Sequence, residues 1–374
     1  MALAVINLKT IDDHRDAVHR AVEALAAGKV VATPTETVYG LAALATDGAA
    51  VERLLAAKRR PEGVPVALAV KNADEAGDFV PEMPPVARRL ARRCWPGPVT
   101  LVVDHGPLEA SLVGRLPESV RCIVAPEGAI GLRVAAHAII YEILQYTTGP
   151  LVLTSANRTG EPDATTAEQV VDGMKEDVDL VLDDGPCRYG QPSSVVRVYR
   201  QRIEMLREGV VGETTINRLA SFMVLMVCTG NTCRSPMAEA LMRKHLATRL
   251  ECNIEALEEH GAIVASAGIA AGTGGRPSPE TVQVLREMGI SLNGHITQPV
   301  TSSLVRHADL ILTMTRGHRD ALVGHWPSAA GRTELLRQDQ RDIPDPIGGP
   351  IDQYRSCAQQ MDDELRLRAA CLEI

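Results

Sequence analysis

The chain has 374 residues, a length that favours two domains over one. With 45% hydrophobic and 23% charged residues it has the composition of a globular protein, and no stretch approaches the roughly 18 uncharged apolar residues of a membrane span, so no membrane partner is expected. Aromatic residues make up 3%, too few for the base-stacking platform of many single-strand nucleic-acid binders. The net charge of -8 divides into -6 for residues 1–213 (23 Lys and Arg against 29 Asp and Glu) and -2 for the rest (16 against 18), so neither half is a basic nucleic-acid clamp.

The eight cysteines form no Cys-x-x-Cys pair, and the N-terminal segment lacks the basic stretch and apolar run of a secretion signal. We therefore expect a protein of the reducing cytoplasm. Cysteines stay as thiols in that compartment, so one of them is available for chemistry.

Predicted helices and short β-branched strands alternate through the first half of the chain, which indicates an α/β layer fold. The apolar spacing predicts helices over residues 16–28, 48–57, 84–94, 137–147 and 166–175. Strands are predicted over residues 28–33, 100–104, 132–135, 150–154, 180–182 and 194–199.

A short polar stretch, residues 211–221, precedes a fresh apolar strand and is predicted to be a linker. It divides the chain into a first domain, residues 1–210, and a second domain, residues 222–374. No internal repeat relates the two. In the second domain, strands are predicted over 222–227, 262–266 and 309–313, and helices over 236–249, 279–289, 318–325 and 352–371.

The strongest chemical motif follows the predicted strand 222–227, where five residues separate Cys228 from Arg234 and a helix begins at Pro236. A tight loop at a helix N-terminus directs backbone N–H groups inward, where they bind a dianion. The same field favours the thiolate form of Cys228, which is the nucleophilic form. Arg234 would offer a bidentate fork to the phosphoryl oxygens, and Ser235 would hydrogen-bond the departing thiolate.

The loop between the nucleophile and the arginine is short and rich in small residues. It consists of Thr229, Gly230, Asn231, Thr232 and Cys233. Gly230 and Asn231 are residue types that tolerate a left-handed backbone, which we expect so tight a cradle to need. The whole loop is therefore a predicted phosphate-binding element.

Transfer through a phosphocysteine also needs an acid for the leaving group and then a base for water. Asp345 stands between Pro344 and Pro346, which would present its carboxylate rigidly, and it is the predicted acid. Asp342 is the weaker candidate. Taken by itself, Cys228 could be a buried thiol at a strand end without a catalytic role. Its combination with Arg234 and Asp345 favours catalysis.

Residues 222–374 resemble the low-molecular-weight protein tyrosine phosphatase family in four segments, Val227–Leu241, Ser266–Ile269, Ala308–Thr315 and Asp345–Gly349. The resemblance implies Cys228 as nucleophile, Arg234 as phosphate binder and Asp345 as general acid, without a cofactor. It also implies a small parallel sheet with helices on both faces.

Two departures from that family bear on the substrate, which is expected to be a phosphoprotein. Tyrosine-specific members usually carry a bulky aliphatic residue where Thr232 stands, and aromatic residues where Ile347 and Gly348 stand. A threonine in the loop resembles the branch that acts on phosphoarginine, so phosphoarginine and phosphotyrosine both stay open. Related arsenate reductases need an additional cysteine pair in the later half of the domain. Residues 253–356 contain no cysteine, which disfavours an arsenate reductase.

Cys233 lies five residues after the nucleophile. It is either a resolving thiol, which would capture an oxidised Cys228 as a disulfide, or a small buried filler.

Polar residues of the first domain gather near the ends of predicted strands, where open α/β sheets bind ligands. Four segments carry them, Thr33–Leu41, Lys58–Pro61, Trp95–Thr100 and Ser155–Asn157. The first combines hydroxyls with a carboxylate, and the second is a compact cation group suited to polyphosphate. Each is weak alone, because a run of cations is usually a solvated face.

Together, and in this order, the four segments resemble the threonylcarbamoyl-AMP synthase (YrdC-like) family over roughly residues 8–210. The resemblance implies a twisted mixed sheet around a large concave cavity. It implies condensation of threonine, bicarbonate and ATP, assisted by Mg²⁺, into threonylcarbamoyl-adenylate, which feeds N6-threonylcarbamoyladenosine formation in tRNA. The protein would thus meet tRNA only indirectly, through the transfer machinery.

The resemblance also assigns residues to two substrates. The threonine-binding set is Thr35, Arg133 and Ser193, and the ATP-binding set is Lys58, Arg60, Ser155, Asn157 and Arg207. No metal ligand from the protein is implied. Lys58 and Arg60 would neutralise charge on the α-phosphate and on the departing pyrophosphate.

Three departures remove possible ligand contacts in the first domain. Val64 and Ala69 stand where the family often has a polar residue and a histidine, and Asp163 stands where a small hydroxyl residue is common. Two alternatives stay open, one for each domain. The first domain could be a non-catalytic module that binds nucleotide or double-stranded RNA, and the second could be a phosphopeptide-binding module.

Overall fold

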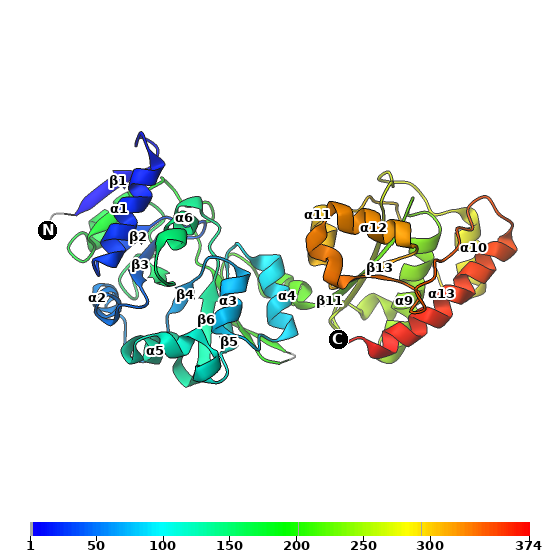
Figure 1. The fold of residues 1–374 in the computed structure, drawn as a ribbon, viewed down its shortest axis with the longest axis horizontal. Coiled ribbons are helices and arrows are strands. Elements are labelled where there is room, and N and C mark those ends of the chain that lie inside the picture. The colour runs from blue at the N-terminus through cyan, green and yellow to red at the C-terminus, as the bar shows by residue number, and fades with distance from the viewer. Residues whose placement is uncertain (1–2, 201, 293) are drawn as a thin grey trace. The chain divides into compact units, whose positions relative to one another are not determined.

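The computed structural model describes residues 3–200, 202–292 and 294–374. The chain forms two compact units, Met1–Ile216 and Asn217–Ile374. Figure 1 shows that each unit combines strands with covering helices, so the α/β class predicted from the sequence is confirmed for both.

The first unit contains, within its described residues, a ten-stranded mixed sheet of order β1-β8-β2-β3-β7-β4-β6-β5-β9-β10. Its strands are β1 (Ala4–Asn7), β2 (Val31–Thr33), β3 (Gly40–Leu44), β4 (Ala67–Ala69), β5 (Val99–Asp104), β6 (Ala129–Arg133), β7 (Leu151–Ser155), β8 (Leu180–Asp183), β9 (Ser194–Val198) and β10 (Ile203–Arg207). Its α-helices are α1 (His14–Ala26), α2 (Gly48–Lys58), α3 (Ala73–Phe79), α4 (Pro85–Cys94), α5 (Glu118–Val124), α6 (Ala138–Tyr146) and α7 (Ala167–Met174). Helix α8 (Glu213–Ala220) contains the boundary between the two units.

The register of this sheet brings distant polar residues together. Strand β3 runs antiparallel to β7 and pairs Gly40 with Ser155. Strand β4 runs parallel to β6 and places Ala69 opposite Arg133. Strand β5 runs parallel to β9 and pairs Val99 with Ser194. Segments about 60 to 115 residues apart in the sequence therefore end side by side.

Helices α1 and α6 pack against one another and cover part of the sheet (Figure 1). The buried face of α1 is built from Val18, Ala21 and Leu25 at helical spacing, and that of α6 includes Ile140 and Ile143. These aliphatic side chains form one cluster with residues of β1, β2, β7 and β8. Small and aliphatic residues thus build this core, as the scarcity of aromatic residues predicts.

The second unit holds, in its described part, a four-stranded parallel sheet of order β12-β11-β13-β14. Its strands are β11 (Phe222–Cys228), β12 (Ala262–Gly268), β13 (Leu310–Thr313) and β14 (Thr333–Leu335). Its α-helices are α9 (Arg234–Arg249), α10 (Pro279–Glu287), α11 (Ser302–His307), α12 (Arg316–His325) and α13 (Ile351–Cys371). Among the described residues no helix is at once long and apolar enough to pass through a membrane.

Alternation along the central strand β11 explains why both of its faces are covered. Val224 and Met226 point into a cluster formed with α9, α10 and α13, whereas Leu225 and Val227 point into a second cluster formed with α11 and α12. Successive side chains of a strand leave opposite faces of the sheet, so a continuous apolar strand needs a helical layer on each side. The predicted small parallel sheet with helices on both faces is therefore confirmed.

The structure differs from the predicted elements in several places. Residues 213–220, within the predicted linker, form α8, and the division of the chain into two units falls between Ile216 and Asn217. Strands β1, β3, β4, β10 and β14 and the short helices α3, α5 and α11 were not predicted. Strand β3 reads Gly-Leu-Ala-Ala-Leu and is buried throughout, so it shows neither the alternation nor the β-branched residues that indicate strands.

Candidate active sites

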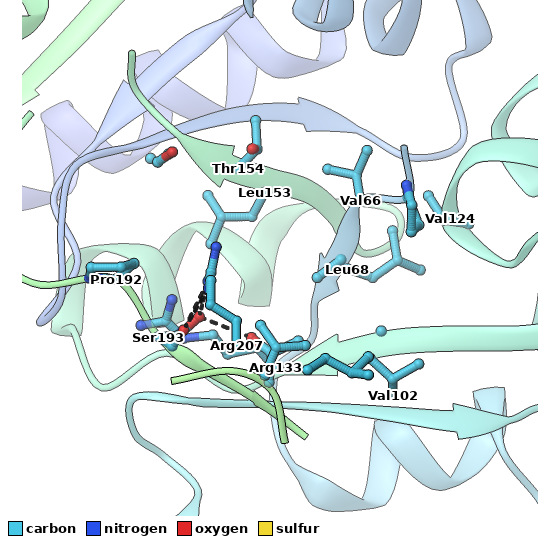
Figure 2. A pocket seen from close by; sticks show the side chains of 18 of the residues that line it. Val66, Leu68, Val102, Val124, Arg133, Leu153, Thr154, Pro192, Ser193 and Arg207 are labelled. Carbon is cyan, nitrogen blue, oxygen red and sulfur yellow. Dashed lines mark hydrogen bonds between the residues drawn. The ribbon is translucent and has the colours of Figure 1, made fainter. Parts of the chain in front are cut away.

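A cavity of about 740 Å³ opens in the first unit, and all eight residues assigned to threonine and ATP line it. They come from strand ends, from the C-terminal end of α2 and from adjoining loops: Thr35, Lys58, Arg60, Arg133, Ser155, Asn157, Ser193 and Arg207. Figure 2 shows Ser193 and Arg207 joined by hydrogen bonds near Arg133, with Val66, Val102 and Val124 on other parts of the wall. The cavity thus combines a cationic region with an apolar one, as sites for small ligands commonly do.

Lys58 is the last residue of α2 and is buried with 4% of its surface exposed. Its Nζ donates to Ser155 O at 2.9 Å and to Asn157 Oδ1 at 2.8 Å, and it also lies 3.0 Å from Ser155 Oγ and Asn157 O. Burial, followed by the charge of Arg60, lowers the pKa of Lys58 to about 8, although Asp163 opposes that shift. Four oxygens therefore hold the ammonium in place, and it titrates near pH 8.

Arg207 ends β10 and donates through Nη2 to Ser193 O at 2.8 Å. A Cβ on Gly209 would lie 2.2 Å from Pro192 O, so only glycine permits this close approach of the chain. Burial lowers the pKa of Arg207, and burial together with the charge of Arg207 lowers the pKa of Arg60. Such crowding of like charges is relieved when a polyanion binds.

Arg133 is held by a buried carboxylate that sequence reasoning did not assign. Its Nη2 donates to Glu36 Oε1 and to Thr37 Oγ1, both at 2.9 Å, and Glu36 is 5% exposed. Thr35 Oγ1 lies 2.8 Å from Thr37 Oγ1 and donates to Val38 O at 2.7 Å. The signal for Glu36 was its place inside the hydroxyl-rich segment Thr33–Leu41.

Sequence reasoning also missed part of the cavity wall formed by β9 and β10. Arg197, Tyr199 and Glu204 line it, and the Arg197 guanidinium is paired with Asp104. Alternate residues of a strand face the same side, so Arg197 is expected on the same face as Ser193 and Val195. This spacing could have indicated Arg197 as a lining residue.

The three departures noted in the sequence have distinct outcomes. Val64 offers its backbone carbonyl, which accepts from Arg60 Nε at 3.1 Å. Ala69 lines the cavity with a methyl group. The carboxylate of Asp163 raises the pKa values of Lys58 and Arg207, so it lies within electrostatic reach of the cations.

A cluster of three or more His, Cys, Asp or Glu side chains able to hold a metal ion does not occur among the described residues. The acidic side chains that line the cavity are Glu127 and Glu204. The described residues therefore do not make a protein-only magnesium cage. Mg²⁺ is commonly held by one or two carboxylates together with substrate phosphates and water.

In the second unit, the predicted phosphate-binding loop joins β11 to α9. Cys228 ends the strand, is 3% exposed, and its Sγ lies 2.9 Å from Ser235 Oγ. The Asn231 N–H donates to the same Sγ at 3.3 Å. Asn231 has a φ of 55°, so the left-handed backbone expected there is present. Gly230 is not among the residues of positive φ, so the expectation that it would share this conformation is wrong.

The loop is supported from beneath by β12. A Cβ on Gly268 would lie 2.5 Å from Thr229 O and 2.8 Å from Asn231 N, so the glycine lets the loop rest on the strand. Asn231 Nδ2 donates at 2.9 Å both to Ser235 Oγ and to Ser266 Oγ. These contacts explain the Ser-Ala-Gly sequence at the end of β12.

Arg234 and Asp345 meet at this site. Arg234 is 5% exposed, its Nη1 donates to Ile343 O at 3.2 Å, and its Nη2 is paired with the carboxylate of Asp345. The Asp345 side chain is 41% exposed, so it reaches both the arginine and solvent. Asp342 instead accepts from the Arg316 N–H at 2.9 Å, at the start of α12. Asp345 is thus the carboxylate beside the loop.

Two further thiols lie near the nucleophile. Cys233 is buried, with its Sγ 3.8 Å from the Tyr354 hydroxyl, and it is a free thiol like Cys228. Burial raises the pKa of Cys357 to about 12, so this thiol stays protonated. Ile347, just after the acid, is 66% exposed.

Comparisons with known proteins divide the chain in the same way. The Sua5/YciO/YrdC family model, described as telomere recombination, matches residues 23–209, and the model for low molecular weight phosphotyrosine protein phosphatase matches residues 223–373. Threonylcarbamoyl-AMP synthase of Pyrococcus abyssi is 33% identical over 199 residues, 51% of this chain and 56% of that protein. The chain thus spans little more than half the length of that relative.

A curated relative of the second unit and a solved structure similar to the chain were also found. Protein-arginine-phosphatase of Bacillus subtilis is 36% identical over 154 residues, 40% of this chain and 96% of that protein. The crystal structure of Pyrococcus abyssi Sua5 complexed with L-threonine matches with a TM-score of 0.51 at 23% identity, covering 71% of this chain and 92% of that one, which shows the fold alone. Residues 23–209 make the chain a member of the Sua5/YciO/YrdC family, and residues 223–373 make it equally a member of the low molecular weight phosphotyrosine protein phosphatase family.

Proposed function

We propose that the chain is a two-site enzyme. Residues 1–210 would be an L-threonylcarbamoyladenylate synthase, a nucleotidyltransferase, and residues 222–374 would be a cysteine-dependent protein phosphatase, with 211–221 between them. The synthase activity is supported by the convergence of all eight assigned residues on one cavity. The phosphatase activity is supported by the contacts of Cys228 Sγ with the Ser235 hydroxyl and the Asn231 N–H.

In the synthase, three cations that line the cavity would bind the nucleotide. Lys58, Arg60 and Arg207 crowd one region and have lowered pKa values, so a triphosphate would relieve their mutual repulsion. Negative charge that develops on the departing pyrophosphate would be stabilised by the same fixed cations. Mg²⁺, when bound with ATP, would supply further neutralisation of the phosphates.

Threonine would bind at Arg133, Thr35 and Ser193. The Arg133 guanidinium is already oriented by Glu36 and Thr37, so a carboxylate would meet a fork of fixed direction. The hydroxyls of Thr35 and Ser193 would orient the amino acid for reaction with bicarbonate. The adenylate product would then pass to tRNA through the transfer machinery, without a broad RNA-binding face on this acidic domain.

The full chain supplied with ATP, bicarbonate, Mg²⁺ and labelled threonine tests the synthase. We expect pyrophosphate release and labelled threonylcarbamoyl-adenylate that require all three substrates. Nucleotide binding without either product would instead support the non-catalytic module, and RNA binding alone would support the double-stranded RNA alternative.

In the phosphatase, Cys228 Sγ would attack phosphorus while the bond from phosphorus to the leaving group breaks. Asp345 would give its proton to that leaving group, and Arg234 would exchange part of its pairing with Asp345 for the phosphoryl oxygens. Water, deprotonated by Asp345, would then attack the phosphocysteine, release phosphate and return the thiolate. Ser235 would hydrogen-bond that thiolate as it departs. Because Cys228 is needed as a free thiol, we place the protein in a reducing cytoplasm.

Among phosphoproteins, we propose phosphoarginine proteins as the substrate. The support is the similarity to the Bacillus subtilis protein-arginine-phosphatase, the half-buried Thr232 in the loop, and an exposed Ile347 where a ring would grip a phenyl group. A panel of phosphoarginine and phosphotyrosine peptides, assayed with the intact chain and with Cys228→Ser, tests this. Faster hydrolysis of phosphotyrosine peptides would assign the site to phosphotyrosine. Binding without hydrolysis would support the phosphopeptide-binding module.

A further inference from the structure

His318, on the first turn of α12, makes two side-chain hydrogen bonds next to the phosphatase loop. Its Nε2 lies 2.8 Å from Thr229 Oγ1, and its Nδ1 lies 3.0 Å from Thr315 Oγ1. Thr229 directly follows the nucleophile and is exposed, whereas His318 is only 9% exposed. A buried imidazole therefore bridges a helix N-cap and the first residue of the loop.

The hydrogen bonds around the ring accommodate the tautomer that carries its proton on Nε2. Thr315 Oγ1 already accepts from the His318 backbone N–H at 3.2 Å, so its own proton is available for Nδ1. In this tautomer Nε2 carries the ring proton and donates it to Thr229 Oγ1. The proton of the Thr229 hydroxyl is consequently free to point to a bound group, because its oxygen is engaged as an acceptor.

The surroundings of the ring favour this neutral form. Burial and the charge of Arg234 lower the pKa of His318, while Asp345 and Asp342 act in the opposite direction. These groups are the arginine and the acid of the proposed site together with the aspartate beside it. The helix itself does not need the imidazole, because the Thr315 hydroxyl caps it through backbone contacts.

We propose that His318 is a positioning residue of the phosphatase, which fixes the Thr229 hydroxyl as a hydrogen-bond donor to the phosphoryl group or leaving group at the mouth of the loop. This proposal rests on the proposed phosphatase function. It assigns a role to two residues, His318 and Thr229, that the proposed chemistry of nucleophile, arginine and acid does not use. A purely structural histidine would act on Thr315 and α12 alone.

Two isosteric substitutions separate the ring nitrogens. The amide nitrogen of glutamine reaches the position of histidine Nε2, so His318→Gln keeps the donor to Thr229. The amide of asparagine reaches only the position of Nδ1, so His318→Asn keeps the contact with Thr315 and loses Thr229. We expect His318→Asn to lower kcat/KM for para-nitrophenyl phosphate about tenfold, the value of one hydrogen bond to a charged group, and His318→Gln to stay within about threefold of the wild type.

Thr229→Val completes the comparison, because it removes the hydroxyl and keeps the shape. We expect it to match His318→Asn, and the double variant Thr229→Val/His318→Asn to lose no more than either single one, since both break the same contact. Equal activity of the Asn and Gln variants, or additive losses in the double variant, would overturn the proposal. Thermal unfolding of each variant shows whether the fold is kept.

Binding of inorganic phosphate, measured by calorimetry on the same full-length variants, separates this proposal from the proposed function. If the wild type binds phosphate but hydrolyses no substrate, the proposed phosphatase activity is wrong. The ranking of the variants by phosphate affinity would still test the role of His318. We expect phosphate affinity to fall about tenfold in His318→Asn and Thr229→Val and to hold in His318→Gln. Unchanged affinity and activity in Thr229→Val would refute a donor role for the hydroxyl.

Discussion

The cavity of the first unit and the loop of the second present positive charge to phosphate in different ways. In the cavity, four side-chain cations from three separate segments converge, namely Lys58 and Arg60, Arg133, and Arg207, and each is held by oxygens of its own unit. In the loop, eight consecutive residues surround one thiol with a backbone N–H, a hydroxyl and one arginine. On the proposed function, the cavity would therefore hold a large polyanion, whereas the loop would hold a single phosphoryl group.

This difference also sets how each site responds to change. A site made of one loop depends on a single nucleophile and a single acid, so removing either has a large effect. A site made of several converging cations shares its work among them, so one substitution weakens it by a smaller factor. The predictions below run from the largest of these effects to the smallest.

The largest effect is expected in the loop. Cys228→Ser should lower phosphatase activity on para-nitrophenyl phosphate by a factor on the order of 10⁴ or more, because the hydroxyl is a far weaker nucleophile. Pyrophosphate release by the first unit should stay unchanged. Cys371→Ser, at an exposed thiol, is the matched control and should leave both activities intact. Residual hydrolysis above about a tenth would show that another residue attacks phosphorus.

The second largest effect is expected for the proposed general acid, Asp345. Asp345→Asn should lower kcat about 10²-fold to 10³-fold, because the amide cannot protonate the leaving group. Asp342→Asn, whose carboxylate accepts a backbone N–H instead, should cost less than about threefold. Measuring kcat for both variants checks the assignment. Equal losses, or a larger loss for Asp342→Asn, would transfer the acid role to Asp342.

In the cavity, Lys58→Met should lower kcat/KM for ATP about 10²-fold, because one fixed cation at the phosphates is lost. Lys175→Met, at an exposed lysine following α7, should have no effect. Phosphatase activity of both variants should equal that of the wild type. If Lys58→Met releases pyrophosphate at the normal rate, Lys58 does not bind the nucleotide.

The pH dependence of the synthase offers a smaller and more specific signal. In the free enzyme the pKa of Lys58 is about 8, so its charge is complete well below that pH and is lost as the pH rises through it. We expect kcat/KM for ATP to fall about tenfold per pH unit above about 8. Lys58→Arg should remove this limb, because a guanidinium does not titrate there. An alkaline limb that survives in Lys58→Arg would assign it to another group.

The smallest effect concerns Asp163, a carboxylate within electrostatic reach of Lys58 and Arg207. Asp163→Ser should lower the KM for ATP about threefold, because one negative charge near the triphosphate is removed. Asp172→Ser, at an exposed position on α7, is the control for net charge. Steady-state kinetics decide the point, and a higher KM in Asp163→Ser would mean that the carboxylate assists binding.

How far the sequence predicted each site follows from how local the site is. The loop from Cys228 to Ser235 is contiguous, so its order along the chain already implies its geometry. The contacts of Arg133 with Glu36 and of Thr229 with His318 join residues about 90 to 100 positions apart, so no local pattern indicates them. The fold class was predictable from alternating elements, whereas β3 and β4 were not, because short strands of Gly, Ala and Leu lack β-branched alternation.

The central claim is that one chain carries two separate active sites, and one crossed assay tests it most directly. Pyrophosphate release from ATP with bicarbonate and threonine, and phosphate release from a phosphoarginine peptide, are measured side by side in the wild type, Lys58→Met and Cys228→Ser. We predict that Lys58→Met loses only the first activity and Cys228→Ser only the second. A wild type that releases no threonine-dependent pyrophosphate, or a Cys228→Ser variant that still releases phosphate, would contradict the account.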